Sequence, residues 1–242
     1  MANIDLARIK GIIFDYGGTL DTGGDHWSEV IWDAWQKAGI RCDKEQFREC
    51  YVYAERELAR TLHILPHHDF HDLLTIKMQI ELQHLTEMGA FAPQDVDAKA
   101  AQTAATCYAS ARAHVDAARP VLQNLSERWP LVLVSNFYGN VTTVLKDFGI
   151  DTLFKDVIES AVAGVRKPDP EIFRMGARAM KLAAENVLVI GDSLRKDIEP
   201  AETIGCQVLW LKGKGWTAEE DARLHPNTIA KLGEVLELLE GA

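Results

Sequence analysis

Carboxylates, a lysine and hydrogen-bonding side chains follow short apolar runs in this chain. Asp15 comes directly after Gly-Ile-Ile-Phe, and Ser135 with Asn136 follows Leu-Val-Leu-Val. Asp192 follows Val-Leu-Val-Ile-Gly, and Lys167 lies in a proline-rich loop. Carboxylates are ligands that Mg²⁺ prefers, and an Asp beside a metal and a lysine is a known type of covalent nucleophile. A single Asp after a strand is more often a turn residue, so only the whole set of residues indicates a site.

The other members of this set could complete a phosphate site. Asp197 lies in the first turn of the helix expected after the fourth run, where a carboxylate can orient the ligands of a metal. Lys167 could neutralise an attacking carboxylate and a phosphoryl oxygen. Ser135 and the backbone amides near Gly18 and Asn136 could donate hydrogen bonds to phosphate oxygens. Together these groups favour magnesium-assisted chemistry at a phosphoryl group.

The apolar runs themselves are typical of buried strands. We expect strands at 11–14, 131–134, 187–190 and 207–211, with a weaker one at 157–160. Helical patterns alternate with them, which predicts an α/β fold with a doubly wound, Rossmann-like parallel sheet. Ligands of such sheets bind beyond the carboxyl ends of the strands, where the chemical groups named above would meet.

A long stretch between the first two strands has helical patterns and no convincing strand. We expect helices at 26–38, 43–61, 69–88 and 93–115. Asp25 and Asp43 are suited to cap the first two. The stretch is too long for a crossover connection. We therefore predict an inserted, all-helical cap domain at 22–118 and a discontinuous catalytic core at 1–21 and 119–242.

The C-terminal part of the chain is expected to complete the core. A separate short helix should start at Pro120, and residues 213–221 are interpreted as a loop. The last helix is expected to carry an apolar face made of Ile229, Leu232, Val235, Leu236 and Leu239.

Four segments, in this order, resemble the motifs of the haloacid dehalogenase-like (HAD) superfamily: F-D-Y-G-G-T-L-D, L-V-S-N, K-P-D-P-E-I-F and V-I-G-D-S-L-R-K-D-I. The helical block resembles that family's first type of cap, C1. The resemblance covers nearly the whole chain. It implies a Rossmann-like core, a mobile cap and Mg²⁺. It also implies hydrolysis of a small phosphorylated metabolite through an aspartyl-phosphate intermediate.

The same resemblance implies roles for individual residues. Asp15 would be the nucleophile and a metal ligand, together with Asp192 and the backbone carbonyl of Gly17. Ser135 and Lys167 would be catalytic and bind phosphate, with Gly18 and Asn136 as further phosphate-binding residues. Asp197 would support the metal site by orienting its ligands, without binding the metal directly.

Gly17 departs from the pattern of the family's phosphatases, which usually carry a general acid and base Asp two residues after the nucleophile. The side-chain proton donor is therefore missing, and such help is typically worth about 10²–10⁴-fold in rate. The enzyme is then a slow phosphatase suited to good leaving groups, or His26, Asp21 or Asp25 transfers the proton, or the reaction differs.

Three other functions stay open. A HAD-type dehalogenase would use Asp15 on a carbon–halogen bond, which leaves Asp192 without a metal to hold. A phosphonatase would need a cap lysine facing Asp15, and the cap offers Lys37, Lys44 and Lys77. A catalytically impaired phosphate-binding or regulatory module would bind metal and phosphate without turnover.

Composition limits the partners of this protein. The net charge of −10 argues against nucleic acid and anionic membranes, which need a basic surface. The chain shows no signal-peptide pattern and no run of membrane-spanning length, so we expect a cytoplasmic protein. Its four cysteines lack C-x-x-C spacing and predict separate, reduced thiols. The oligomeric state is not predicted.

Some further features have a plain structural explanation. The four histidines in residues 63–71 favour a solvated loop, ahead of substrate contact and of a metal site. The stripe from Trp27 to Trp35 is typical of a cap core. Arg166 and Arg195 flank the predicted site, as surface charges or as phosphate contacts.

Overall fold

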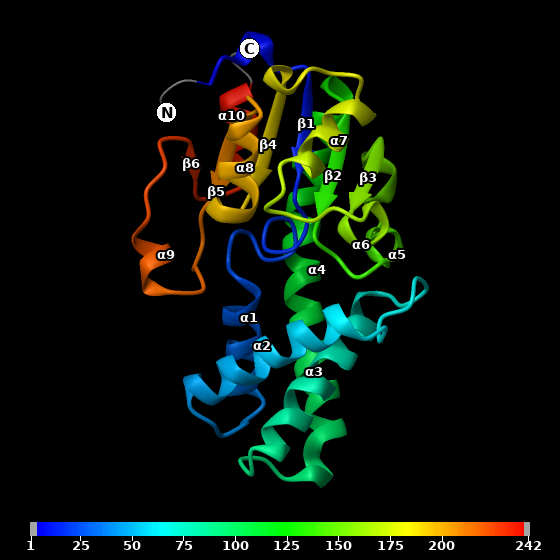
Figure 1. The fold of residues 1–242 in the computed structure, drawn as a ribbon, viewed down its shortest axis with the longest axis vertical. Coiled ribbons are helices and arrows are strands. Elements are labelled where there is room, and N and C mark those ends of the chain that lie inside the picture. The colour runs from blue at the N-terminus through cyan, green and yellow to red at the C-terminus, as the bar shows by residue number, and fades with distance from the viewer. Residues whose placement is uncertain (1–3, 240–242) are drawn as a thin grey trace.

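The computed structural model describes residues 4–239 and contains a six-stranded parallel sheet with helices on both faces (Figure 1). Its strands are β1 (Gly11–Phe14), β2 (Leu131–Ser135), β3 (Asp156–Glu159), β4 (Val187–Gly191), β5 (Gln207–Leu211) and β6 (Thr228–Ile229). Their order in the sheet is β3-β2-β1-β4-β5-β6, the order of Rossmann-type doubly wound folds. The predicted fold class is therefore confirmed. Residues 1–3 and 240–242 of the predicted core lie outside the described residues.

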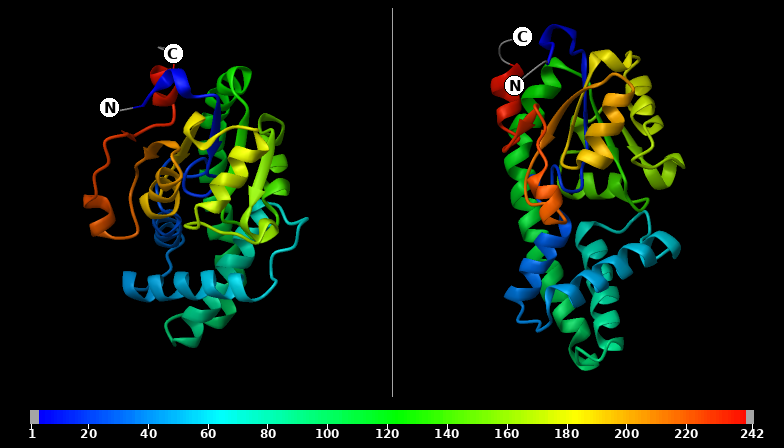
Figure 2. Two further views of the ribbon diagram at one scale, coloured as in Figure 1. Left: turned by 45° about the horizontal axis from the view of Figure 1, so that its top comes forward. Right: turned by 60° about the vertical axis from the view of Figure 1, so that its left-hand side comes forward.

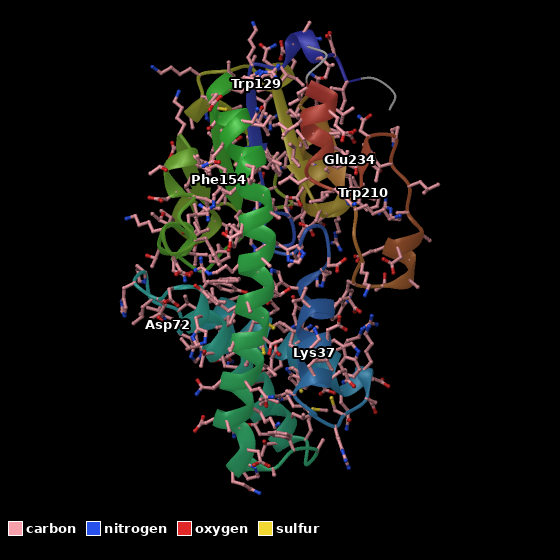
Figure 3. The ribbon with its side chains drawn as sticks, turned by 180° about the vertical axis from the view of Figure 1, so that it is seen from behind. Lys37, Asp72, Trp129, Phe154, Trp210 and Glu234 are labelled. Carbon is pink, nitrogen blue, oxygen red and sulfur yellow. The ribbon has the colours of Figure 1, made fainter. Side chains whose placement is uncertain are left out.

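Successive strand residues face opposite sides of the sheet, which gives it two apolar faces. Ile12 and Phe14 pack on the side of α4 (Val96–Arg128), α5 (Val141–Asp147) and α10 (Glu234–Leu239), seen from behind in Figure 3. Ile13 packs on the opposite side, which is covered by α7 (Glu171–Ala179) and α8 (Glu199–Thr203). Both faces of β1, β2 and β4 are buried, so these strands appear in the sequence as continuous apolar runs.

Three helices and the first half of α4 lie beyond the carboxyl ends of the strands (Figures 1 and 2). These helices are α1 (Trp27–Lys37), α2 (Lys44–Arg60) and α3 (Phe70–Glu87). Trp35 is fully buried there, with its ring edge-on to that of Phe47 at 5.1 Å. Ile31 and Trp35 of the α1 stripe are buried in the core, as predicted. Trp27 packs partly buried against the same core and also lines the cavity described below.

The helix starts follow from local capping chemistry, with one correction. Asp43 and Asp69 each accept a hydrogen bond from the third residue of their helix and form complete capping boxes. Asp25 does not cap α1, contrary to prediction. His26 does, through Nδ1, which accepts from the Ser28 N–H at 3.2 Å. The Asp25 carboxylate accepts instead from a distant backbone N–H, that of Lys214.

Helix α4 corrects a second prediction, because one helix replaces the two expected around residue 118. It runs unbroken through Pro120, with about 50 Å of length at 1.5 Å per residue. A proline inside a helix removes one backbone hydrogen bond and is costly. Pro120 is exposed, while Val115 and Leu122 on either side of it are buried against the same apolar core. Burial of that continuous face outweighs the local cost.

The C-terminal segment corrects a third prediction. Ile229 belongs to strand β6 and pairs with Leu211, and Leu232 lies in the turn before the last helix. Neither is part of that helix, which spans Glu234–Leu239. A two-residue edge strand is too short to leave a sequence pattern. The predicted loop at 213–221 includes the short helix α9 (Ala218–Ala222). The remaining short elements are η1 (Leu6–Arg8), η2 (Pro93–Asp95), η3 (Asp151–Leu153), α6 (Ser160–Ala163), η4 (Ala184–Asn186) and η5 (Leu194–Ile198).

The cysteines and the helices agree with the composition of the chain. Cys42, Cys50, Cys107 and Cys206 all carry free thiols, as predicted, and burial raises the pKa of the Cys42 thiol to about 11. Within residues 4–239, every helix is too short or too polar to cross a bilayer.

Candidate active site

The predicted site residues meet at the point where the strand order reverses. Strand β1 lies between β2 and β4, so Asp15, Ser135 and Asp192 come from three adjacent strand ends. The N–H of Asp15 donates to the carbonyl of Ile190 at 3.0 Å and extends the β1–β4 ladder by one residue. A cavity of about 610 Å³ opens on this edge, a size typical of small-molecule sites.

Asp15 and Asp197 share one buried lysine. Lys167 Nζ lies 2.6 Å from Asp15 Oδ1 and 2.6 Å from Asp197 Oδ1. Burial alone would lower the pKa of Lys167, but the two carboxylates outweigh that effect and hold it above its ordinary value. The ammonium is therefore charged. Ser135 Oγ donates to the same Asp15 oxygen at 3.1 Å.

Asn136 positions the loop that carries Lys167. Its side-chain amide donates to the Lys167 carbonyl at 3.0 Å and accepts from the Lys167 N–H at 2.9 Å. This pair of hydrogen bonds joins the end of β2 to the loop. The side chain of Asn136 is thus engaged by the protein backbone, and a contact between its backbone amide and phosphate stays a prediction.

The acidic residues form a cluster that fits a hard divalent cation. Carboxylate oxygens of Asp15, Asp192 and Asp197 lie within 4.8 Å of one another, the only such group in the described part of the chain. Lys167 supplies one positive charge against three carboxylates. Burial and the charge of Asp15 accordingly raise the pKa of Asp192 well above its ordinary value. Mg²⁺ would balance this excess and prefers such oxygen ligands.

Within this cluster the three carboxylates are not equally available. Asp197 already accepts with both oxygens, from Lys167 at 2.6 Å and from the Ser193 N–H at 3.0 Å. Asp15 also accepts with both oxygens, whereas the hydrogen bond that the described residues give Asp192 falls on Oδ1, so Asp192 Oδ2 is the oxygen best placed to bind a metal directly. Thr19, to which the sequence assigned no role, donates to Asp192 at 2.9 Å and lies 3.4 Å from Asp15. Its place within the first motif was the available signal.

Gly17 and Gly18 differ sharply in the space around them. Gly18 has φ +96°, and a Cβ there would lie 2.5 Å from Asp192 Oδ2. Its N–H donates to Asp21 Oδ1 at 2.7 Å, so contact between this amide and phosphate stays a prediction and would compete with Asp21. A Cβ on Gly17 would meet no described atom within 4 Å. Gly17 lines the cavity and leaves open space where a side chain could stand.

Comparison with known proteins identifies the family. A family model for haloacid dehalogenase-like hydrolases matches residues 9–205. The chain belongs to that family. The resemblance seen in the four sequence motifs is thereby confirmed, and so is the prediction that the protein is a hydrolase.

Relatives of this HAD hydrolase include two named phosphatases. The glyceraldehyde 3-phosphate phosphatase of Methanocaldococcus jannaschii is 39% identical over 93 residues, which are 38% of this chain and 40% of that protein. The phosphoserine phosphatase of Thermus thermophilus is 35% identical over 63 residues, or 26% of this chain and 25% of that protein. The matches thus span less than half the length of these relatives.

Solved structures share the HAD fold over nearly the whole chain. The magnesium-bound putative HAD-hydrolase YfnB of Bacillus subtilis superimposes with a TM-score of 0.57 at 22% identity and covers 96% of this chain and 99% of its own. A dehalogenase in an intermediate complex gives a TM-score of 0.65 at 14% identity, with 96% and 97% covered. At these identities the likeness shows the fold alone.

The three candidates for the missing proton donor of this hydrolase differ in whether they line the cavity. Asp21 and Asp25, both among the described residues, do not line the cavity, whereas His26 does. Burial, together with the charge of Lys196, lowers the pKa of His26 to about 4. Its Nδ1 accepts from the Ser28 N–H, so the ring hydrogen lies on Nε2. Neutral imidazole can donate a hydrogen bond there but is a poor acid.

The three cap lysines also differ in whether they line the cavity. Lys77 lines the cavity, whereas Lys37 and Lys44 do not. Lys77 donates to Glu55, and this carboxylate overcomes the effect of burial and raises the pKa of Lys77 well above its ordinary value. An amine that adds to a carbonyl must be neutral. This ion pair therefore disfavours the imine chemistry of a phosphonatase.

The four histidines of residues 63–71 and the two arginines near the site differ in their position relative to the cavity. None of His63, His67, His68 and His71 lines the cavity, and none belongs to a metal-ligand cluster of the described residues. The substrate contact considered for them is thus not observed. Arg195 lines the cavity and Arg166 does not.

Sequence reasoning missed the segment between β5 and α9. Gly213, Lys214, Gly215 and Trp216 line the cavity, although the stretch has the pattern of an ordinary loop. The Trp216 ring packs against Tyr51 of the cap at 5.4 Å, and the Arg48 guanidinium lies 4.9 Å from its centre. A lone tryptophan in a glycine-rich loop was the only signal for this wall of the site.

Proposed function

We propose that this HAD hydrolase is a Mg²⁺-dependent phosphatase that acts on a small phosphorylated metabolite through an aspartyl phosphate on Asp15. The observation that carries the proposal is the position of Asp15. It opens on the cavity, 2.6 Å from a charged lysine and beside the carboxylates of Asp192 and Asp197. Relatives named as phosphatases support the substrate class, and a magnesium-bound neighbour supports the metal.

In the first step, an oxygen of Asp15 would attack phosphorus. The bond between phosphorus and the leaving oxygen breaks, and its electron pair stays on that oxygen. Lys167 would balance negative charge on the attacking carboxylate and the phosphoryl group, and Ser135 would turn its hydroxyl to a phosphoryl oxygen. Mg²⁺ held by Asp15, Asp192 and the Gly17 carbonyl would neutralise phosphoryl charge and orient the group for in-line transfer.

In the second step, water would attack the phosphorus of the aspartyl phosphate and release phosphate, which restores the Asp15 carboxylate. Both steps need a proton transfer, first to the leaving oxygen and then from the water. Gly17 offers no side chain for it, and His26 is neutral and a poor acid. The enzyme would therefore prefer esters whose leaving groups are stable without protonation, such as aryl phosphates.

The cap and core division of residues 22–118 against 1–21 and 119–242 is part of this proposal. Helix α4 crosses position 118 without a break, so the two parts share one rigid element. We place the enzyme in the cytoplasm, with a small-molecule substrate and neither nucleic acid nor a membrane as partner. The net charge of −10 supports this assignment.

The test is hydrolysis of an aryl phosphate with Mg²⁺ and with EDTA, in the native protein and in Asp15→Asn. We expect metal-dependent turnover that falls to background in this variant. Asp33→Asn, an exposed carboxylate on α1, is the matched control and should keep full activity. Turnover that persists in Asp15→Asn would overturn the nucleophile. Halide release from 2-haloacids without metal would favour a dehalogenase, and Mg²⁺ binding without turnover would favour a binding module.

A further inference from the structure

A polar cluster lies on the wall of the cavity that the helices α2 and α3 form. Glu55 of α2 accepts from Lys77 of α3 through Oε1. The hydroxyl of Tyr138, which follows β2 in the core, lies 3.1 Å from Oε1 and 3.3 Å from Oε2 of the same carboxylate. All three residues line the same cavity as Asp15. The cluster therefore joins the cap helices to the sheet side of the site.

Both members of the pair carry charge at neutral pH. Burial alone would raise the pKa of Glu55, but the charge and the hydrogen bond of Lys77 bring it below its ordinary value. The same attraction raises the pKa of Lys77. The two groups thus form an ion pair in a partly dry wall, where each charge is costly unless it is paired.

The carboxylate is the member that faces the cavity. The side chain of Glu55 is 39% exposed, and that of Lys77 is only 6% exposed. The Lys77 ammonium sits 4.2 Å from the centre of the Tyr51 ring, which covers it on that side. Among residues 4–239, Glu55 Oε2 has a single long hydrogen bond, from Tyr138, and a carboxylate oxygen can accept more than one. Acceptor capacity therefore remains on the exposed side.

Apart from Tyr51, whose ring covers Lys77, the rest of this wall is apolar. Val52, Phe70, Leu73 and Leu74 line it around Glu55 and Lys77. A polar group of a bound molecule that met only these side chains would lose its hydrogen bonds with water and gain none. On the α2 and α3 wall, a hydrogen-bond donor can be satisfied at Glu55.

We propose that Glu55, held by Lys77 and Tyr138, is a subsite for a hydroxyl or ammonium donor on the leaving group of the phosphate ester. The inference rests on the proposed phosphatase function and narrows its substrates to phosphate esters whose leaving group carries a hydroxyl or an ammonium. A carboxylate on the leaving group would meet the Glu55 charge and be disfavoured. Lys196 and Arg195 also line the cavity, so an anionic leaving group is a necessary arm of the test.

The test measures recognition apart from chemistry, with phosphonates that mimic the ester and cannot lose the alcohol. Propylphosphonate is the reference, and 3-hydroxypropyl-, 3-aminopropyl- and 2-carboxyethylphosphonate carry a hydroxyl, an ammonium or a carboxylate. Dissociation constants come from calorimetry with Mg²⁺ present, and inhibition constants come from competition with an aryl phosphate. We expect a donor-bearing compound to bind at least about fivefold more tightly than propylphosphonate, and the carboxylate to bind most weakly.

Variants then assign the effect to Glu55. Glu55→Gln should remove most of the advantage of the ammonium compound, and Tyr138→Phe, which frees the carboxylate from its core partner, should weaken the selectivity in a second, independent way. Glu49→Gln on the same helix, with a 61% exposed side chain, is the matched control and should leave the ranking unchanged. Thermal unfolding verifies that each variant is folded.

The hydroxyl and ammonium compounds distinguish hydroxyl-bearing from ammonium-bearing leaving groups, according to which compound binds more tightly. Equal affinities for all four compounds, tightest binding of the carboxylate, or a ranking that survives in both Glu55→Gln and Tyr138→Phe would overturn the subsite. Selective binding in calorimetry without turnover of the aryl phosphate would support the subsite and contradict the phosphatase function. Turnover without selective binding would support the phosphatase function and contradict the subsite.

Discussion

Restoring a carboxyl group at position 17 tests the proposed chemistry most directly. A Cβ at Gly17 meets no described atom within 4 Å, and Gly17 is not in the left-handed backbone region that would strain a side chain. Gly17→Asp should therefore fold without displacing its neighbours. The new carboxyl would project from a residue that lines the cavity, two positions after Asp15, where the family's phosphatases usually carry their general acid and base.

The size of the effect follows from the role of the missing group. General acid–base catalysis is typically worth about 10²–10⁴-fold, or about 3–5 kcal/mol of activation free energy at 1.36 kcal/mol per tenfold. The nearby carboxylates of Asp15 and Asp192 would raise the pKa of the added group, which favours the protonated acid in the first step. The gain should approach this range for alkyl phosphates, whose leaving oxygen needs a proton, and stay small for aryl phosphates.

The assay compares kcat for one alkyl and one aryl phosphate in the native protein, in Gly17→Asp and in Gly17→Asn. Asparagine has the same size and cannot donate a carboxyl proton, so it separates acid catalysis from a packing effect. We expect the alkyl-to-aryl ratio to rise at least about 100-fold in Gly17→Asp alone. An unchanged ratio, or an equal rise in Gly17→Asn, would refute the claim that the proton donor is what this site lacks.

Two further substitutions test the site and the cap. Gly18→Ala should abolish or strongly weaken Mg²⁺ binding measured by calorimetry, because its Cβ would lie 2.5 Å from Asp192 Oδ2. Gly17→Ala is the control and should bind Mg²⁺ normally. Similar Mg²⁺ affinities of the two variants would contradict the proposed metal geometry. Burial raises the pKa of Glu81 to about 8, and its carboxyl oxygens have no hydrogen-bond partner among residues 4–239. The native state then keeps a proton that the unfolded chain releases near pH 4.5, so stability should fall by up to about 1.4 kcal/mol per pH unit as pH rises towards 8. Denaturant unfolding at pH 5–8 should show this slope flattened in Glu81→Gln, and parallel slopes would contradict it.

Local chemistry made much of the fold and the polar edge of the site predictable. The strands that end at Asp15, Ser135 and Asp192 are buried on both faces, so each appears in the sequence as an unbroken apolar run. The parallel arrangement then brings their carboxyl ends to one edge whatever the details of packing. The starts of α2 and α3 were also predictable from the sequence, because capping depends on residues only three positions apart.

Other features depend on contacts between residues far apart in the chain, which no local pattern records. Helix α4 passes Pro120 because burial on both sides of it outweighs a local penalty, and β6 exists only through its pairing with β5. The interaction of Glu55 with Tyr138 spans 83 positions.

The sequence by itself determined the α/β architecture and the identity of the residues at the strand ends. Tertiary structure alone decided which backbone and side-chain donors are already engaged at the site, which cap side chains line the same cavity as Asp15, and which loop closes that cavity. The physical reason is that strand and helix patterns arise from burial and hydrogen bonding of near neighbours. The wall opposite the strand ends is assembled from α2, α3 and the segment after β5, whose side chains meet only once the chain has folded.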